Sequence, residues 1–345
     1  MSTFSSNPRI NLQGSKIHIH GAIIEEIEGL IRVYKDGYIE RPQMIANVPC
    51  NTIQEVSVAS KDIIINQHTN LWSRLYIPSY SFSGKFPVLL YFHGGGFCLG
   101  SASWSCYDEF LANLSWKAGC IIVSLNYRLA PEHRLPAAYE DGFNTLIWLK
   151  QQAWNDSPEH KWWLNYCNFN RLFLGGDSAG ANIAYNVAIR LGSSTNINII
   201  KPFCLRGVIL VQPFFGGEEQ SLFEKNVTTQ LESNSALTVS ASDTYWRLSL
   251  PVGANRDHPW CNPVAISANK LRNLNLPSTM VCVSEMDILK ERNLEFCRVL
   301  ASVGKKVEKV VYRGVGHAFQ ILHNSQFSEV RTQELMADIK SFINK

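Results

Sequence analysis

The sequence predicts an α/β fold in which a mostly parallel central sheet carries helices on both faces. From Pro87 onward, short apolar runs alternate with stretches of helical spacing. The runs are apolar throughout, which is typical of strands buried on both sides. Alternating strands and helices favour parallel pairing through right-handed crossovers. With 345 residues, 46% of them hydrophobic, the chain has enough apolar side chains for one large domain.

The N-terminal part departs from this pattern. Its first residues are polar, and residues 22–37 then carry apolar side chains at helical spacing, which predicts a short helix followed by an extended segment. Residues 62–78 predict a hairpin, because Ile63 and Ile65 alternate in the first arm and residues 68–70 form a polar turn before the second.

The remaining elements follow in chain order. Strands are expected to begin at Pro87, Cys120, Arg171, Gly207, Thr279 and Lys306. Helices are expected over residues 137–152, 181–192, 291–304 and 330–345. Residues 216–263 are polar, aromatic and irregular, and they interrupt the alternation after the sixth strand. We therefore expect a single domain, 1–345, with cap elements at about 1–40 and 216–263.

Charge and cysteine usage narrow the classes of function. Lys and Arg exceed Asp and Glu by 32 − 29 = 3, without a basic block, which argues against nucleic-acid or anionic-membrane partners. The nine cysteines are scattered, and none forms a Cys-x-x-Cys pair. This usage predicts reduced thiols and a cytoplasmic location. No hydrophobic leader or apolar run of about 20 residues occurs, so no membrane span is expected.

The stretch "GDSAG" is the first candidate for chemistry. It follows an apolar run and precedes a helix-like segment, with Gly176 and Gly180 flanking Ser178. In a nucleophile elbow, this pattern exposes the serine hydroxyl on a strained strand-to-helix turn. The N–H of Ala179 would then point towards a developing oxyanion. The alternative is a glycine-rich turn with a serine helix cap, and the motif alone does not exclude it.

A second glycine motif, "HGGGF", directly follows the strand that begins at Pro87. Glycines let backbone N–H groups approach a reacting atom closely, so Gly95 and Gly96 are candidate oxyanion donors beside Ala179. An ordinary glycine-rich loop between a strand and a helix is the alternative.

A serine nucleophile needs a base, and the base needs an acid that orients it. His317 is the preferred base, because it lies in a glycine-flanked loop after the last strand. His323 is a weaker option. Asp287 and Glu285 both follow the penultimate strand, and Asp287, further into the loop, is the preferred acid. A helix cap and a surface ion pair, respectively, are the structural alternatives for these two carboxylates.

The chain order Ser178, Asp287, His317 is that of α/β-hydrolases, which differs from the orders in chymotrypsin and subtilisin. The motifs "HGGGF", "NYRLAPEHRLPAAYEDG", "GDSAGAN" and "GVGHAF" together resemble the plant carboxylesterases of the hormone-sensitive-lipase-like branch of this family. The resemblance extends over nearly the whole chain. It implies a cofactor-free hydrolase with a capped sheet, with these three residues as catalytic triad and Gly95, Gly96 and Ala179 as oxyanion hole.

The related gibberellin receptors lose the catalytic histidine, and hydroxyisoflavanone dehydratases can carry threonine in place of the serine. Because histidine and serine are both present here, hydrolysis is favoured over a receptor, while a lyase stays open. A metal site is not expected, since no His, Asp or Glu cluster has ligand spacing. The candidates for lining the substrate pocket, with core packing as the alternative, are Phe214, Phe215, Tyr245, Trp246 and Trp260.

Overall fold

The computed structural model describes residues 20–50, 58–79, 84–155, 158–193, 199–226 and 235–345. Contacts between Cα atoms divide the chain into two units, Met1–Pro42 and Gln43–Lys345. The prediction of a cap formed by residues 1–40 stays a prediction, and residues 1–19 lie outside the described part.

The first unit contains a small antiparallel sheet of three strands, β1 (Ile23–Ile27), β2 (Ile31–Tyr34) and β3 (Ile39–Glu40). The prediction of a short helix within residues 22–37 is therefore wrong. Gly29 adopts φ +72° in the turn between β1 and β2, and Ile27 pairs with Ile31 across it. β-Branched residues fit a pleated strand well, and Ile31 and Val33 are buried on one side of β2.

The second unit is built around a sheet of eight strands. They are β4 (Val58–Asn66), β5 (Leu71–Pro78), β6 (Phe86–Phe92), β7 (Ile121–Asn126), β8 (Cys167–Asp177), β9 (Leu205–Val211), β10 (Ser278–Ser284) and β11 (Val307–Tyr312). Their order is β11-β10-β9-β8-β6-β7-β5-β4. β5 runs antiparallel to both of its neighbours, and all other pairs are parallel. The predicted hairpin, the predicted strands and the mostly parallel sheet are confirmed.

Helices follow most strands. They are α1 (Ser105–Ala118), α2 (Ala137–Trp154), α3 (Lys161–Leu164), α4 (Ala179–Gly192), α5 (Leu222–Asn226), α7 (Val239–Ser249), α8 (Ala268–Asn273), α9 (Lys290–Ser302), α10 (Phe319–Leu322) and α11 (Ser328–Ile343). The four predicted helices correspond to α2, α4, α9 and α11. α1 is not among the predictions, although Tyr107, Phe110, Leu111 and Leu114 are buried at helical spacing.

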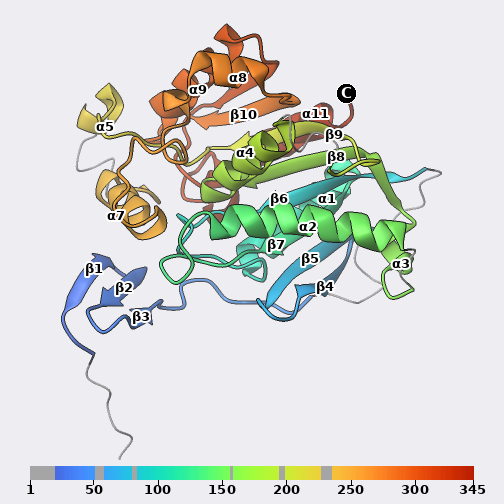
Figure 1. Cartoon of the computed structure of the whole chain (residues 1–345), viewed down its shortest axis with the longest axis horizontal. Helices are drawn as coiled ribbons and strands as arrows, with labels where there is room; N and C mark the ends of the chain where they lie inside the picture. The colour runs from blue at the N-terminus through green and yellow to red at the C-terminus, as the bar shows by residue number, and fades with distance from the viewer. Residues whose placement is uncertain (1–19, 51–57, 80–83, 156–157, 194–198, 227–234) are drawn as a thin grey trace, which may run out of the picture. The chain divides into compact units, whose positions relative to one another are not determined.

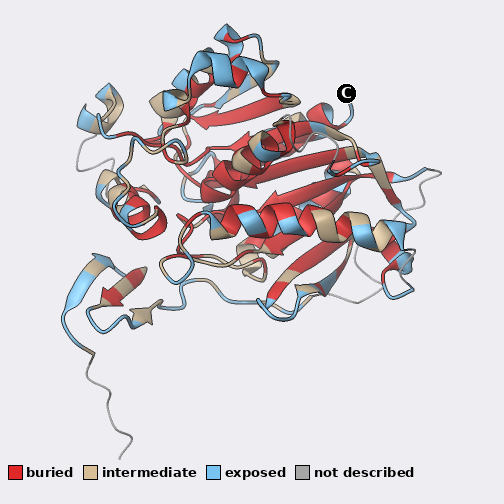
Figure 2. Cartoon of the chain, viewed as in Figure 1, coloured by how far each residue is buried: buried red, intermediate tan, exposed pale blue. Residues whose placement is uncertain are grey.

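The helices cover both faces of the sheet (Figure 1). α1 and α11 contact each other, and their buried residues form one core cluster with side chains of the strands, including Tyr91 and Cys282. α2 and α4 contact each other and lie in front of the sheet in Figure 1. Figure 2 shows the central strands buried along their length, whereas α2 is buried along one side only. The sheet is thus a two-sided core, as continuous apolar strands require.

Residues 216–263 follow β9 and precede the 3₁₀ turn Pro263–Ala265. Their described part holds α5, α7 and a series of turns, and residues 227–234 lie outside the described part. In Figure 1, α7 lies beyond the carboxyl ends of the central strands. α7 therefore stands over the edge of the sheet where parallel strands usually present functional groups.

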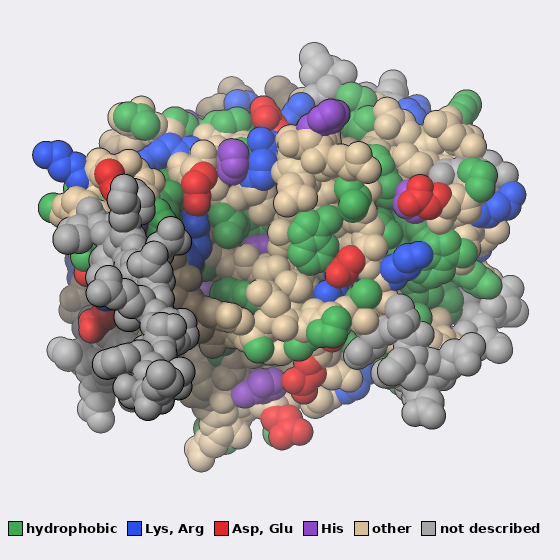
Figure 3. All heavy atoms as spheres, turned by 90° about the horizontal axis from the view of Figure 1, so that it is seen from below, with side chains coloured by type: hydrophobic (Ala, Val, Ile, Leu, Met, Phe, Trp, Pro, Cys, Tyr) green, Lys and Arg blue, Asp and Glu red, His purple; other side chains and the backbone are tan. Residues whose placement is uncertain are grey.

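The surface carries mixed charges. On the face shown in Figure 3, Lys and Arg side chains are interspersed with Asp and Glu among the described residues. All nine cysteines lie in the described part and are free. Among the described helices, none has the length and apolar character needed to cross a membrane.

Candidate active site

Ser178 occupies the turn between β8 and α4, in a backbone conformation that non-glycine residues rarely adopt, with φ +52° and ψ −119°. Hydrogen bonds hold it there. Its N–H donates to the carbonyl of Val211 at 2.8 Å, and its own carbonyl accepts from the N–H of Phe214 at 3.0 Å. The end of β9 therefore fixes the turn that β8 enters.

The two flanking positions must be glycine, because neither has room for a side chain. A Cβ on Gly176 would lie 2.5 Å from the carbonyl carbon of Gly180, and a Cβ on Gly180 would overlap the carbonyl oxygen of Phe92. Strand β6, the turn and the start of α4 thus meet without room for side chains, which is the steric situation of a nucleophile elbow.

Ser178, His317 and Asp287 meet at the carboxyl edge of the sheet, although each comes from a different strand end. Ser178 Oγ lies 2.9 Å from His317 Nε2, and His317 Nδ1 lies 2.8 Å from Asp287 Oδ2. Asp287 Oδ1 also accepts from the N–H of Leu289 at 3.1 Å. All three side chains are buried. The arrangement lets the histidine accept the serine proton while the carboxylate holds the ring.

Glu285, the alternative acid, has another partner. Its Oε2 accepts the N–H of Gly314 at 3.0 Å, and Gly314 begins the loop that carries His317. Glu285 thus ties the end of β10 to the start of that loop, while Asp287 contacts the imidazole itself. His323 is exposed and ends α10.

Gln212 holds the histidine loop on both sides of His317. Its Oε1 accepts from the N–H of Ala318 at 2.7 Å, and its Nε2 donates to Ser284 Oγ and to the carbonyl of Gly316 at 3.4 Å. The sequence reasoning missed this residue. A polar side chain at the end of the apolar run "GVILVQ" was the available signal, because buried polar groups need partners.

In the "HGGGF" loop, the carbonyls of Gly94 and Gly95 are hydrogen-bonded within the loop and its surroundings. The carbonyl of Gly94 bonds to His93 Nδ1 at 2.8 Å and accepts from Tyr127 Oη at 3.3 Å, and that of Gly95 accepts from the N–H groups of Cys98 and Leu99. Peptide units are planar and trans, so each following N–H, of Gly95 and of Gly96, points in the opposite direction. Neither N–H donates within the described structure.

Comparison with known proteins decides the family. A family model described as alpha/beta hydrolase fold matches residues 89–321. The chain is 46% identical over 330 residues to probable carboxylesterase 6 of Arabidopsis thaliana, covering 95% of this chain and 93% of that protein. It is 35% identical to 2-hydroxyisoflavanone dehydratase of Glycyrrhiza echinata, covering 93% and 96%. An esterase structure from Pyrobaculum calidifontis superposes with a TM-score of 0.67 at 24% identity, covering 82% of each chain.

The chain belongs to the α/β-hydrolase family.

The "RLAPEHRLP" block of this α/β-hydrolase is joined to the glycine loop by a backbone hydrogen bond. Arg128 Nη2 lies 2.7 Å from Asp141 Oδ1, and the N–H of Arg128 donates to Asp141 Oδ2 at 2.9 Å. The N–H of Ala130 donates to the carbonyl of Phe97, the last residue of the loop motif. The block therefore supports the glycine loop as part of the scaffold.

The five aromatic candidates for the pocket have different surroundings. Tyr245 packs on the glycine loop, where a Cβ on Gly96 would lie within 2.5 Å of a ring carbon. Phe214 stacks on Trp246 with ring centroids 4.6 Å apart, and Trp260 meets Tyr139 edge to face at 5.5 Å. Phe215 packs against Tyr185 and Phe296 in the core. Tyr245 is thus the aromatic side chain in direct contact with a candidate oxyanion donor.

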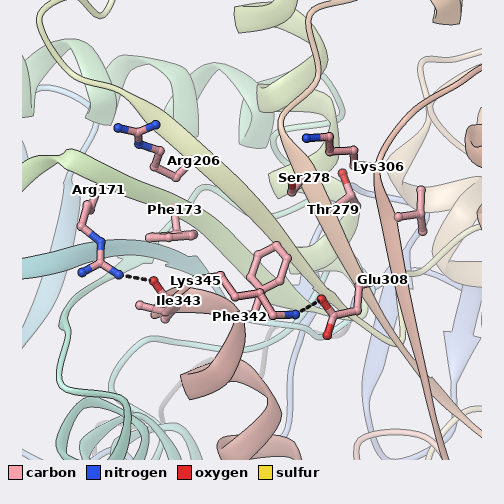
Figure 4. A pocket seen from close by; sticks show the side chains of 11 residues that line it. Arg171, Phe173, Arg206, Ser278, Thr279, Lys306, Glu308, Phe342, Ile343 and Lys345 are labelled. Carbon is pink, nitrogen blue, oxygen red and sulfur yellow. Dashed lines mark hydrogen bonds and ion pairs between the residues drawn. The ribbon is translucent and has the colours of Figure 1, made fainter.

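A pocket of about 770 Å³ lies at the opposite end of the sheet (Figure 4). Figure 4 shows Phe173 and Phe342 in its middle, with Arg171 and Arg206 on one side and Lys306 on the other. Serine and threonine hydroxyls occur there, but no histidine is among the described residues that line it. Without a nucleophile and base in contact, it does not resemble a hydrolase active site. No cluster of His, Cys, Asp or Glu suited to a metal occurs among the described residues.

Proposed function

We propose that this α/β-hydrolase is a serine carboxylesterase that hydrolyses carboxylic esters of short to medium acyl chains through an acyl-enzyme. The observation that carries the proposal is the hydrogen-bonded series Ser178 Oγ, His317 and Asp287. The likeness over 95% of the chain to a probable carboxylesterase supports it.

In this mechanism, Ser178 Oγ attacks the ester carbonyl carbon while His317 Nε2 takes the hydroxyl proton. Asp287 keeps Nδ1 protonated and stabilises the imidazolium. The tetrahedral intermediate then collapses, the C–O bond to the alcohol breaks, and His317 protonates the departing oxygen. Water, deprotonated by His317, attacks the acyl-enzyme, releases the carboxylic acid and restores the serine hydroxyl.

Gly95, Gly96 and Ala179 would supply the N–H groups that hold the oxyanion. Ala179 is the first residue of α4, where N–H groups have no partner within the helix and the helix dipole favours negative charge. One preorganised donor of this kind is typically worth about 3 kcal/mol of activation free energy.

The cap over residues 216–263 would shape the substrate site, with Tyr245 in contact with the glycine loop. We propose a cytoplasmic location, in agreement with nine free thiols, and a small-molecule ester as partner, without a nucleic acid and without a cofactor. A lyase acting through the same residues is the second candidate, because a relative with 35% identity is named a dehydratase.

The test is hydrolysis of p-nitrophenyl esters from acetate to decanoate by the wild type, by Ser178→Ala and by Ser124→Ala. Ser124 is a matched control, since it is a buried serine without a hydrogen-bond partner among the described residues. We expect turnover to fall by at least about 10³-fold in Ser178→Ala and to stay within twofold in Ser124→Ala.

A wild type that turns over none of the esters, and whose Ser178 is not labelled by a fluorophosphonate, would contradict the esterase. Dehydration of a hydroxylated substrate by such a protein would instead support the lyase.

A further inference from the structure

A buried carboxylate lies directly beneath the glycine loop and outside the triad. Asp177, the residue before the nucleophile, is 1% exposed. Its Oδ1 accepts from Tyr91 Oη at 2.8 Å, and its Oδ2 accepts from Tyr107 Oη at 2.9 Å. Tyr107 Oη in turn accepts the N–H of Gly94 at 2.7 Å. A series of two hydrogen bonds therefore joins the carboxylate to the loop that carries the candidate oxyanion donors.

The backbone N–H of Gly94, at one end of this series, fixes which group donates and which accepts in each of its hydrogen bonds. A backbone N–H can only donate, so the oxygen of Tyr107 accepts from Gly94. The hydroxyl proton of Tyr107 must then go to another acceptor, and Asp177 Oδ2 is that acceptor. The ionised carboxylate is the form that accepts from Tyr107 and Tyr91 together without presenting a donor of its own.

Close packing reinforces the link. A Cβ on Gly94 would lie 2.7 Å from Asp177 Oδ2 and 3.1 Å from Tyr107 Oη, so the loop backbone rests on these two side chains. From the other side, Tyr127 Oη donates to the carbonyl of His93 at 2.8 Å. The peptide between His93 and Gly94 is therefore held at both its carbonyl and its N–H.

We propose that Asp177 is a positioning residue, which acts through Tyr107 to hold the peptide of Gly94 so that the N–H groups of Gly95 and Gly96 face the substrate oxygen. This inference rests on the proposed esterase function. The side-chain hydrogen bonds of the Asp177 carboxylate go to Tyr91 and Tyr107 rather than to Ser178 or His317, so its role is one of positioning. Tyr107 lies in the first turn of α1, so the series also ties the start of that helix to the glycine loop that precedes it.

Burial raises the pKa of Asp177 to about 6, and the two tyrosine hydrogen bonds oppose that rise. The charged and titratable groups that act on it are His317, Tyr91 and Tyr107. The assay is therefore best run near pH 8.5, where the carboxylate is ionised in the wild type.

The test compares Tyr107→Phe with Tyr91→Phe. Both tyrosines are 1% exposed, both donate to Asp177, and each variant loses one hydroxyl. Only Tyr107 bonds to the loop. We expect kcat for a p-nitrophenyl ester to fall at least tenfold in Tyr107→Phe with KM changed less than threefold, and to stay within threefold in Tyr91→Phe.

Two further measurements separate positioning from a general loss of structure. The inhibition constant of a trifluoromethyl ketone, whose hemiketal oxyanion occupies the oxyanion hole, should rise in Tyr107→Phe by the factor by which kcat/KM falls. It should stay within threefold in Tyr91→Phe, although urea unfolding should show similar losses of stability in both. Asp177→Ala should resemble Tyr107→Phe, because it removes the oxygen that accepts the Tyr107 hydroxyl proton.

Equal kcat and equal inhibition constants in the two tyrosine variants, beside an active wild type, would overturn the positioning role and leave the esterase intact. A wild type inactive on every ester would overturn both proposals together.

Discussion

At the scale of single residues, the histidine of the glycine loop, His93, is held uncharged by burial. His93 is completely buried, stacks on Tyr127 with ring centroids 4.2 Å apart, and donates from Nδ1 to the carbonyl of Gly94. Its Nε2 has no hydrogen-bond partner among the described residues. Burial lowers the pKa of His93 from 6.5 to about 4, so the folded protein holds a neutral imidazole there.

This pKa predicts how stability depends on pH. Well above pH 6.5, His93 is neutral in both the folded and the unfolded protein, so its titration does not lower the free energy of unfolding there. As the pH falls from 6.5 towards 4, the unfolded chain binds a proton that the folded chain does not, so stability is lost in this window. The loss from this group approaches about 3 kcal/mol.

The measurement is the free energy of urea unfolding between pH 7 and pH 4 for the wild type and for His93→Asn, whose amide can donate to the same carbonyl without titrating. We expect the variant to lose less stability than the wild type by up to about 3 kcal/mol. Parallel pH curves for the two proteins would refute the prediction. In both the wild type and His93→Asn, Asp177 changes the free energy of unfolding in the opposite direction. Its raised pKa favours the folded state as the pH falls from 6 to 4.

At the scale of elements, α7 is fastened to the glycine loop. Ser249 Oγ lies 3.2 Å from the carbonyl of Gly96, and the N–H of Leu135 donates to the carbonyl of Ser249 at 2.9 Å. Arg134 Nη1 donates to the carbonyls of Arg247 and Leu250, both at 2.7 Å. The ring of Tyr245 then covers the Cα of Gly96. The wall of the proposed substrate site is thus part of the scaffold.

Tyr245→Ala should open space beside Gly96. We expect the preferred p-nitrophenyl ester to shift towards longer acyl chains, and stability to fall by about 3–5 kcal/mol, as for other large buried side chains cut back to alanine. Phe215→Ala is the matched control, because Phe215 is also buried but packs against Tyr185 and Phe296. It should lose similar stability and keep the wild-type chain-length preference. An unchanged preference in Tyr245→Ala would show that this ring does not border the acyl site.

Most elements were predictable because their signals are local. Continuous apolar runs gave β6 to β11, and the polar turn after Ile65 gave the hairpin of β4 and β5. Residues 22–37 misled because the spacing of Ile23, Ile24, Ile27 and Ile31 fits a helix as well as two short strands. The β-propensity of these residues could have decided between a helix and two strands, since β-branched residues on both sides of a glycine turn favour a hairpin.

The site was predictable only in part, for a related reason. The motifs around Ser178 and His317 are local, and parallel strands bring their carboxyl ends to one edge. The supporting contacts are distant in the sequence: 70 residues separate Tyr107 from Asp177, and 106 separate Gln212 from Ala318. No spacing rule connects such pairs, since they depend on the packing of whole elements.

At the scale of the whole molecule, the core holds its thiols without cross-links. All nine cysteines are free, and burial raises the pKa of Cys106 and Cys120 to about 12 and that of Cys297 to about 11. Thiolates are therefore scarce at neutral pH. Stability must come from the two-sided core around the sheet rather than from disulfides.

We expect the thermal midpoint to be the same, within about 1 °C, with and without dithiothreitol, since a lost disulfide typically costs 2–5 kcal/mol. A thiol reagent should react slowly with the six buried cysteines of the native protein and titrate nine thiols in denaturant. A midpoint that drops on reduction, or fewer than nine titratable thiols, would contradict this description of the core.

The backbone of Ser178 has one more consequence, which concerns how such a chain evolves. A non-glycine residue at φ +52° and ψ −119° is held at a cost of roughly 1–3 kcal/mol. Glycine relieves that cost, so the substitution that abolishes the nucleophile is also one that stabilises the fold. Selection for catalytic activity must therefore keep removing the Ser178→Gly substitution, which stability alone would favour. A duplicated copy freed from that selection would lose its chemistry while its fold became more robust, and its pocket would then be available for binding alone.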